Sequence, residues 1–241
     1  MTTLIPFLPG AQAVEPPHNG WCQLLCRKGH IVMSEVDPQS GRATPPPATA
    51  SAIADPAPLG LAGFAMTTVV LSVFNAGLLD KSVEAVVLPL ALVYGGLAQL
   101  LAGMWEFRRG NTFGATAFSS FGAFWLAYYF LVKEVVPVTA TSSELHNATG
   151  LFLLVWGIFT LYMTVAALRV NHAVLAVFVF LTITFVVLAI GDFAKNTDIT
   201  KAGGWLGLVT GVIAWYTSFA GVVSTTFNRQ VLPVTVPRKQ I

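Results

Sequence analysis

Six apolar runs follow one another between residues 57 and 224, and short polar stretches separate them. Each run is close to the roughly 20 residues that an α-helix needs to cross a hydrocarbon core of about 30 Å. Asp, Glu, Lys, Arg and His fall at the ends of the runs or between them. Backbone polar groups in lipid must be bonded within the chain, so runs of this length predict helices rather than strands. The pattern predicts an all-α membrane protein with six transmembrane helices, at approximately 57–79, 86–105, 113–132, 149–168, 173–191 and 203–224.

The composition agrees with a membrane protein. Of the 241 residues, 55% are hydrophobic and only 10% are charged, and the mean hydropathy is +0.71. A soluble domain needs more charged side chains than this to cover its water-facing surface. The formal net charge of +2 is too small, and the Lys and Arg residues too scattered, to indicate a nucleic-acid partner. We therefore expect a lipid-embedded six-helix domain over residues 55–227.

The two ends of the chain differ from this apolar domain. The stretch GRATPPPATASAIADP is rich in Pro, Ala, Thr and Ser, so residues 1–54 are predicted to form a disordered tail. The first 14 residues lack the basic start of a secretory signal, and Met33 offers an alternative translation start. Cys22 and Cys26 lack a set of His or Cys partners, so reduced thiols are expected rather than a metal site. Residues 228–241 are expected to form a second tail.

The cations between the apolar runs predict the orientation of the bundle. Nine Lys and Arg residues share one side with both ends of the chain, and four lie on the other side. The nine are Arg27, Lys28, Arg42, Arg108, Arg109, Arg169, Arg229, Arg238 and Lys239, and the four are Lys81, Lys133, Lys195 and Lys201. Because cytoplasmic loops carry the excess of Lys and Arg, we expect a multi-pass protein of the plasma or inner membrane with both termini in the cytoplasm.

The sequence DPAPLGLAGF at 55–64 marks the start of the first apolar run heavily. Asp55 can cap a helix, Pro56 suits its first position, and Pro58 still lies in the first turn, where a missing N–H loses no partner. One cap and one proline would be enough for a helix start. The excess, followed by Gly60 and Gly63, favours a close backbone approach at a pore mouth, with an ordinary well-capped membrane helix as the alternative.

This motif resembles the signature of the succinate–acetate permeases, also called acetate uptake transporters, which is Asn-Pro-Ala-Pro-Leu-Gly-Leu followed by Phe. Leu59 and Gly60 match it, and Asp55 stands where Asn is usual. The stretch YGGLAQLLAGMWEFRRGNTFGATAFSSFGAFW at 94–125 is similar to the second and third helices of that family, and LAIGD at 188–192 to the end of its fifth. The likeness covers residues 55–232. It implies a six-helix protomer with its own pore, assembled as a hexamer, that passes acetate and in some members succinate, as a channel or as a proton-coupled carrier.

The resemblance also implies an apolar ring of Phe, Tyr and Leu that narrows the pore. Matched motif by motif, the three positions hold Phe64, Phe121 and Leu181. Phe121 departs from the family pattern, because it removes a phenolic hydroxyl from the narrowest point. The usual rate and substrate preference of the family therefore do not carry over to this chain directly.

The spacing of polar residues along the first run supports a pore independently. Phe64, Thr68, Leu71 and Asn75 recur at intervals of four, three and four residues, which puts them on one helix face. The Asn75 amide is a suitable neutral ligand for a carboxylate. The alternative is that Thr68 and Asn75 only bond neighbouring helices. The face that contains Leu181 is almost wholly apolar, which favours small, weakly hydrated or neutral solutes.

Four further polar residues are expected to have structural roles. Gln99 and Glu106 share a face of the second run with glycines, which favours helix packing over pore lining. Glu106, followed by two arginines, is expected to form an ion-pair cluster close to water rather than to carry protons. Asn111 and Thr112 are predicted to cap the third helix. Because no buried His or carboxylate is expected in the lumen, the sequence favours passive passage over coupled pumping.

The sequence gives little support to an enzyme. The four His residues fall in the tail or near the ends of runs, and no metalloprotease, nucleophile-elbow or phosphate-binding glycine motif is present. We expect no catalytic residue, no metal and no cofactor. The competing membrane classes are a urea or amide channel, which can share a six-helix hexameric plan, and a receptor, which would need a larger soluble face.

Overall fold

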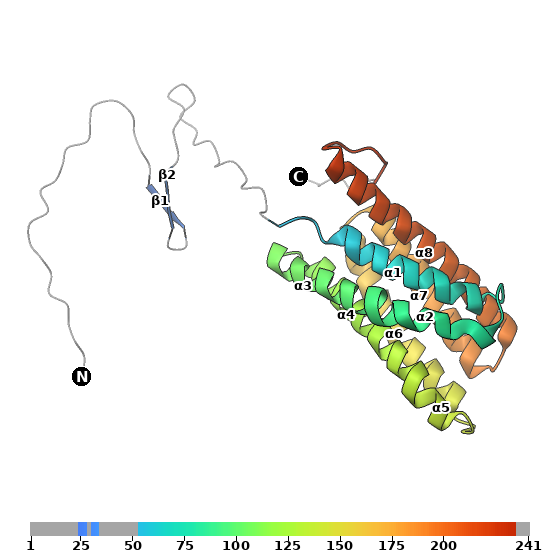
Figure 1. Ribbon diagram of the computed structural model, residues 1–241. Helices are drawn as coiled ribbons and strands as arrows, with labels where there is room; N and C mark the ends of the chain where they lie inside the picture. The colour runs from blue at the N-terminus through green and yellow to red at the C-terminus, as the bar shows by residue number, and fades with distance from the viewer. Residues whose placement is uncertain (1–23, 28–29, 34–52, 235–241) are drawn as a thin grey trace, which may run out of the picture. The chain divides into compact units, whose positions relative to one another are not determined.

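The computed structural model describes residues 24–27, 30–33 and 53–234, which fall into two units (Figure 1). The first unit contains a short antiparallel hairpin of β1 (Leu24–Arg27) and β2 (His30–Met33), in which Leu24 lies opposite Met33. The hairpin falls in a segment for which the sequence predicts no strand. Cys22 lies outside the described residues, as does most of both predicted tails.

The second unit is a bundle of helices that makes six passes (Figure 1). In chain order the elements are α1 (Ala57–Asn75); η1 (Lys81–Val86), α2 (Val87–Leu92), η2 (Val93–Ala98) and α3 (Gln99–Arg109); α4 (Thr112–Phe130), η3 (Leu131–Val135) and α5 (Val136–Thr139); α6 (Leu145–Ala167); α7 (His172–Phe193); and α8 (Thr197–Thr226). All six passes are long and apolar enough to cross a membrane, which confirms the predicted six-helix membrane domain.

Several passes extend further into polar sequence than the apolar runs predict. The second pass begins at Lys81 rather than at residue 86, and the third ends at Thr139 rather than at residue 132. Polar side chains satisfy the free N–H groups at such ends, as where Asp80 Oδ1 accepts from the Ser82 N–H at 2.7 Å. Hydrogen bonds from the Ser82 side chain and backbone lower the pKa of the Asp80 carboxyl below its ordinary value. Backbone bonding rather than hydropathy decides where a helix ends.

Two glycines with positive φ set the ends of other helices. α1 ends at Asn75, four residues before its predicted end at residue 79, and Gly77, at φ +74°, follows shortly after. Gly110, at φ +76°, is the C-cap of α3 and lets the chain reverse directly into α4. Glycine adopts this left-handed conformation at little cost, whereas a side chain at either position would be strained.

Two π-helical segments, η2 and η3, interrupt the second and third passes. η2 contacts both α1 and α4. A Cβ on Gly95 of η2 would lie 2.5 Å from the Thr67 Oγ1 of α1 and 3.0 Å from the Trp125 ring of α4. The absence of a side chain therefore lets η2 lie close to both helices. Isolated π turns of this kind are often found at functional sites.

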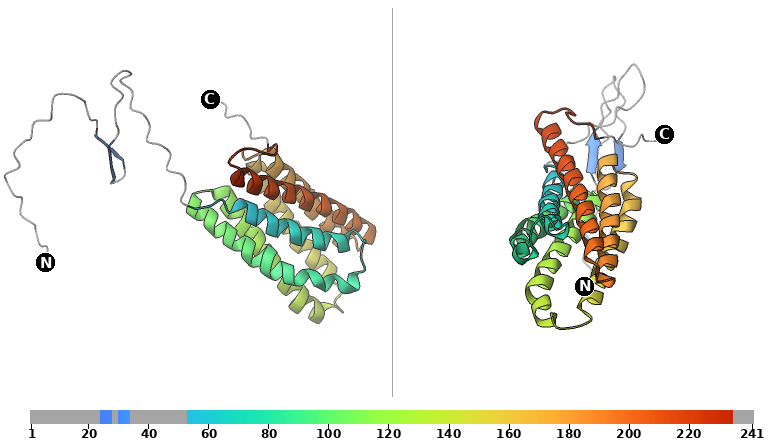
Figure 2. Two further views of the ribbon diagram at one scale, coloured as in Figure 1. Left: turned by 45° about the horizontal axis from the view of Figure 1, so that its top comes forward. Right: turned by 90° about the vertical axis from the view of Figure 1, so that its right-hand side faces the viewer.

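The passes pack in a small number of extensive contacts, of α1 on α8, α6 on α7, α7 on α8, and α3 on α4 (Figure 2). On α3, a Cβ on Gly103 would clash with Ser119 of α4, so small residues bring these two helices together. The buried hydrophobic cluster contains Phe64, Phe121, Phe178 and Leu181, from α1, α4 and α7. This cluster separates the two cavities described next.

Candidate functional site

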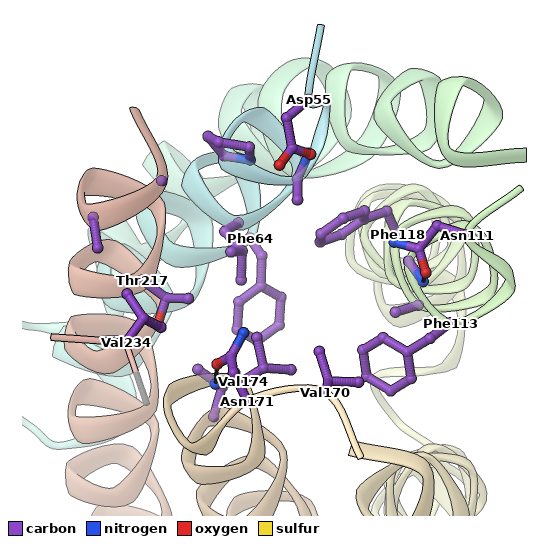
Figure 3. Close-up of a pocket in the computed structure, with 18 of the residues that line it drawn as sticks. Asp55, Phe64, Asn111, Phe113, Phe118, Val170, Asn171, Val174, Thr217 and Val234 are labelled. Atoms are coloured by element: carbon purple, nitrogen blue, oxygen red, sulfur yellow. Dashed lines mark hydrogen bonds between the residues drawn. The ribbon is translucent and has the colours of Figure 1, made fainter. Parts of the chain in front are cut away.

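Two cavities lie at opposite ends of the helical bundle. The larger, about 530 Å³ in volume, lies where α1, α4 and α7 begin and α8 ends (Figure 3). The smaller, about 210 Å³, lies where α1 and α7 end and α6 and α8 begin. Phe64 and Leu181 border both cavities, and they are 5% and 4% exposed. Buried apolar side chains therefore separate the two cavities.

Phe121, the third residue of the implied narrowing, borders the larger cavity. Its ring centroid lies 5.6 Å from that of Phe64, 5.4 Å from Phe159 and 6.0 Å from Phe178. Leu181 borders the same cavity. Phe64, Phe121 and Leu181, the three positions assigned to the narrowing, thus all border the larger cavity. They lie at the boundary between the larger and the smaller cavity.

The polar face of α1 continues from this boundary into the smaller cavity. Thr68, Leu71 and Asn75 border the smaller cavity, together with Phe64. The Thr68 side chain is 7% exposed, and its hydroxyl has no hydrogen-bond partner among the described residues. Within the described bundle, the Thr68 hydroxyl therefore makes no hydrogen bond to a neighbouring helix, which is the alternative role considered for Thr68 above.

Asp55 lies one residue further from the first helix than the sequence predicts. α1 begins at Ala57 with Pro56 as its N-cap, because the Pro56 carbonyl already accepts from the Gly60 N–H at 3.1 Å. The Asp55 carboxylate accepts from the Ala57 N–H at 3.0 Å and pairs with Arg109 Nη1 at 2.5 Å. The ion pair gives a reason for an acid at this position, since it ties the start of α1 to the end of α3.

The rest of the DPAPLG motif divides between the cavity and the surface. Pro58 borders the larger cavity, and its carbonyl accepts from the Ser218 hydroxyl of α8 at 2.6 Å. A Cβ on Gly60 would lie 2.6 Å from the Phe118 ring of α4, which also borders that cavity. Leu59 is 44% exposed and borders neither cavity. The motif therefore combines a close helix contact with one wall of a cavity mouth.

The prediction that Glu106 lies close to water is wrong, because its side chain is 0% exposed. Its Oε2 accepts from Asn111 Nδ2 at 2.9 Å and lies 3.8 Å from Arg109 Nη1. The chain reversal after α3 brings the start of α4 over the carboxylate, where a Cβ on Gly114 would lie 2.9 Å from Oε1. Glu106 also borders the larger cavity. A buried carboxylate therefore stands beside the lumen, where none was expected.

The other polar residues of this region lie partly on the cavity wall. Gln99 is 1% exposed and borders the larger cavity, and its Oε1 has no partner within the described residues. Asn111 is the N-cap of α4, accepts from the Gly114 N–H at 3.1 Å, and borders the same cavity. Thr112 is the first residue of α4, is exposed and borders neither cavity.

Several lining residues were missed from the sequence. Trp125 and Tyr128 of α4 border the smaller cavity, but aromatic residues in an apolar run are not distinguishable from ordinary core. Arg229, Gln230 and Val234, which follow α8, border the larger cavity, and Val234 is visible in Figure 3. The polar sequence beyond the last apolar run gave no indication that the chain turns back toward the bundle.

Known proteins resemble the chain along most of its length. It is 41% identical over 184 residues to the succinate-acetate/proton symporter SatP of Escherichia coli K12, and this alignment covers 76% of this chain and 95% of SatP. It is 42% identical over 184 residues to the ammonia transport outward protein 2 of Saccharomyces cerevisiae. That alignment covers 74% of this chain but only 64% of the yeast protein, so the chain matches slightly less than two thirds of that relative.

The fold and the family assignment agree with these alignments. The solved structure of the bacterial acetate channel SatP matches with a TM-score of 0.70 and 40% sequence identity, over 76% of this chain and 99% of that one. The family model described as the GPR1/FUN34/yaaH family matches residues 37–238. On this evidence the chain belongs to the GPR1/FUN34/yaaH family.

Proposed function

We propose that this chain is a membrane channel or transporter that passes acetate and related short carboxylates, succinate among them. The observation that carries the proposal is a pair of cavities at opposite ends of one bundle that meet at Phe64 and Leu181. The substrate class is supported by relatives named for acetate and succinate. The relatives reported above are named for transport rather than for a catalysed reaction, so we do not propose an enzyme.

The apolar boundary favours small or neutral solutes. Burying an unpaired carboxylate costs several kcal/mol or more, whereas a neutral polar group such as a protonated carboxyl costs about 1–3 kcal/mol. Acetate carries a methyl group, and its acid form suits a passage between Phe64, Phe121 and Leu181. Phe121 offers no hydroxyl to such a solute, so we expect its passage to depend on polar groups on either side of the boundary.

Polar groups suited to a carboxylate flank the boundary on both sides. Thr68 and Asn75 supply a hydroxyl and an amide in the smaller cavity. On the other side, α1, α4 and α7 all begin at the larger cavity. Helix N-termini carry partial positive charge, which attracts anions. We assign Thr68 and Asn75 as substrate ligands, and Leu71 as an apolar wall between them.

The sequence favoured passive passage because no buried carboxylate was expected beside the lumen. The buried Glu106 at the larger cavity removes this reason. An ionisable side chain that is buried beside a pore can take up and release a proton, and such residues often mark proton pathways. We therefore leave the proposal open to a proton-coupled carrier, and the dependence of uptake on a proton gradient distinguishes it from a channel.

The proposed assembly is a homo-hexamer in the plasma or inner membrane, with both termini in the cytoplasm. The excess of Lys and Arg on the side of the termini supports this orientation. Large apolar side chains such as Leu101, Trp105 and Leu161 are exposed on the single bundle, and lipid or neighbouring protomers would cover them. Protease protection of epitope-tagged termini and native mass spectrometry test the two statements separately.

Uptake of labelled sodium acetate into liposomes that contain the purified protein tests the function. We expect entry above that of protein-free liposomes, which report leakage of the neutral acid through lipid, both with and without an inward proton gradient. The sodium salt is needed because one relative is named for ammonia transport, and ammonium acetate would confound the two solutes. Labelled urea, run in parallel, tests the alternative urea or amide channel. Absence of protein-dependent acetate entry would refute the proposal.

A further inference from the structure

Beyond α8 the chain forms a strap, which we define as residues 228–234, along the edge of the larger cavity. The turn into the strap is made by Asn228, at φ +50°, and by the Arg229 N–H, which donates to the Ser224 carbonyl at 3.2 Å. Tyr216 Oη of α8 donates to the Pro233 carbonyl at 3.0 Å and holds the far end of the strap against the helix. Hydrogen bonds at both ends therefore fix the strap beside the cavity.

The strap brings a cation to the cavity. Among the described residues, Arg229 is the one Lys or Arg that borders the larger cavity, whereas the acidic residues that border it are Asp55 and Glu106. Asp55 is already paired with Arg109. None of the ion pairs found in the described part of the chain includes Arg229. Arg229 is thus an exposed cation at the mouth of a largely apolar cavity, with no carboxylate partner among residues 53–234.

The balance of charge at this mouth depends on Arg229. With Glu106 ionised, Asp55 and Glu106 contribute two negative charges, and Arg109 and Arg229 contribute two positive charges. Of these four side chains, removal of Arg229 leaves two acids and one base, which is a net negative charge. This negative charge would oppose the attraction that the helix N-termini exert on carboxylates before they reach the apolar boundary.

We propose that Arg229 recruits the carboxylate group of the substrate at this mouth and makes the protein selective for short organic anions. This inference rests on the proposed function and adds the residue that captures the substrate. A guanidinium presents paired N–H donors that match the two oxygens of a carboxylate. A carboxylate held by Arg229 can leave its methyl group facing the apolar lining, which is the orientation that entry toward Phe64 requires.

The test compares initial rates of labelled sodium acetate uptake, below saturation, for the full-length wild-type protein and three variants in liposomes. Arg229→Gln removes the charge, and Arg229→Lys keeps it. Arg108→Gln is the matched control, because Arg108 lies at the same end of the bundle but borders neither cavity. We expect Arg229→Gln to lower the rate about fivefold at low salt, the upper range for an exposed charge pair. The difference should shrink near 0.5 M salt, where unscreened charges interact over only about 4 Å.

The outcomes separate this inference from the function on which it rests. A near wild-type rate for Arg108→Gln and an intermediate rate for Arg229→Lys, beside a salt-sensitive loss for Arg229→Gln, would support it. An unchanged rate for Arg229→Gln, an equal loss in Arg229→Lys or Arg108→Gln, or a loss that is undiminished at high salt would overturn it while wild-type uptake stands. Absence of acetate uptake by the wild-type protein would instead refute the proposed function.

Discussion

Replacing Phe64 with Ala tests whether the boundary between the cavities selects substrates by size. The Phe64 ring is 5% exposed, borders both cavities and packs against Phe121 with 5.6 Å between ring centroids. Its removal joins the two cavities through the space that the ring leaves. An apolar site discriminates by about 1–3 kcal/mol, or roughly 10–200-fold, for one extra methylene group, and succinate exceeds acetate by a methylene and a carboxylate group. Because Phe121 and Leu181 remain, we take the lower end and expect the acetate-to-succinate preference to fall about tenfold.

The same substitution removes a buried side chain, so stability has to be measured alongside transport. Truncation of a buried Phe to Ala costs about 3–5 kcal/mol of the free energy of unfolding in a well-packed core. A variant that loses this much can misassemble, and its low transport would then say nothing of selectivity. Phe64→Leu, which leaves a smaller gap, provides a second and milder widening. Gel filtration and thermal unfolding in detergent identify the variants that remain folded.

The assay measures labelled acetate and labelled succinate uptake in the same liposome preparation and compares their ratio. Phe219→Ala is the matched control, because Phe219 is 58% exposed on α8 and borders neither cavity. Its ratio should equal that of the wild-type protein. A folded Phe64→Ala protein with an unchanged ratio would show that the boundary at Phe64 does not set the substrate size.

Three further predictions concern the polar groups. Asn75→Leu removes a proposed substrate ligand and should lower acetate uptake without preventing assembly; a wild-type rate from the folded variant rejects the assignment. Gly114→Ala places a methyl group 2.9 Å from the buried Glu106 Oε1. The resulting overpacking should lower the free energy of unfolding by about 1–3 kcal/mol. Arg109→Gln leaves Asp55 and the buried Glu106 without their shared cation and should lower the free energy of unfolding by at least about 1 kcal/mol, the value for the partly exposed pair with Asp55 alone. Adding Asp55→Asn should recover part of that loss, and equal melting temperatures for the single and double variants would contradict the pairing.

The six passes were predictable because apolar runs of membrane length leave few alternatives. Their ends were less predictable, since a residue such as Asp80 can begin a helix by bonding an N–H group, although its polarity counts against helix in a hydropathy window. The helix face of Phe64, Thr68 and Asn75 followed from spacing alone. Its neighbours across the bundle did not, because one sequence contains no information on which helices lie side by side.

The errors at the larger cavity have one physical cause, which is chain reversal. Glu106 looks exposed in the sequence because it stands near charged residues at the end of an apolar run. It is buried because Gly110 turns the chain and Asn111 returns over the carboxylate. Likewise, Arg229 follows the last apolar run and was assigned to a free tail, whereas a turn directs it to the cavity. Local polarity predicts exposure only where the chain continues away from the bundle.

The π turn η2 determines which side of the second pass meets the lumen. Because successive residues of an α-helix are about 100° apart, winding residues 93–98 as a regular α-helix, with no residue removed, would rotate everything after them by about that angle. Gln99 and Glu106 would then leave the cavity wall, and Arg109 would turn away from Asp55. The wide turn thus absorbs one surplus residue and fixes the azimuth of the half-pass that follows it.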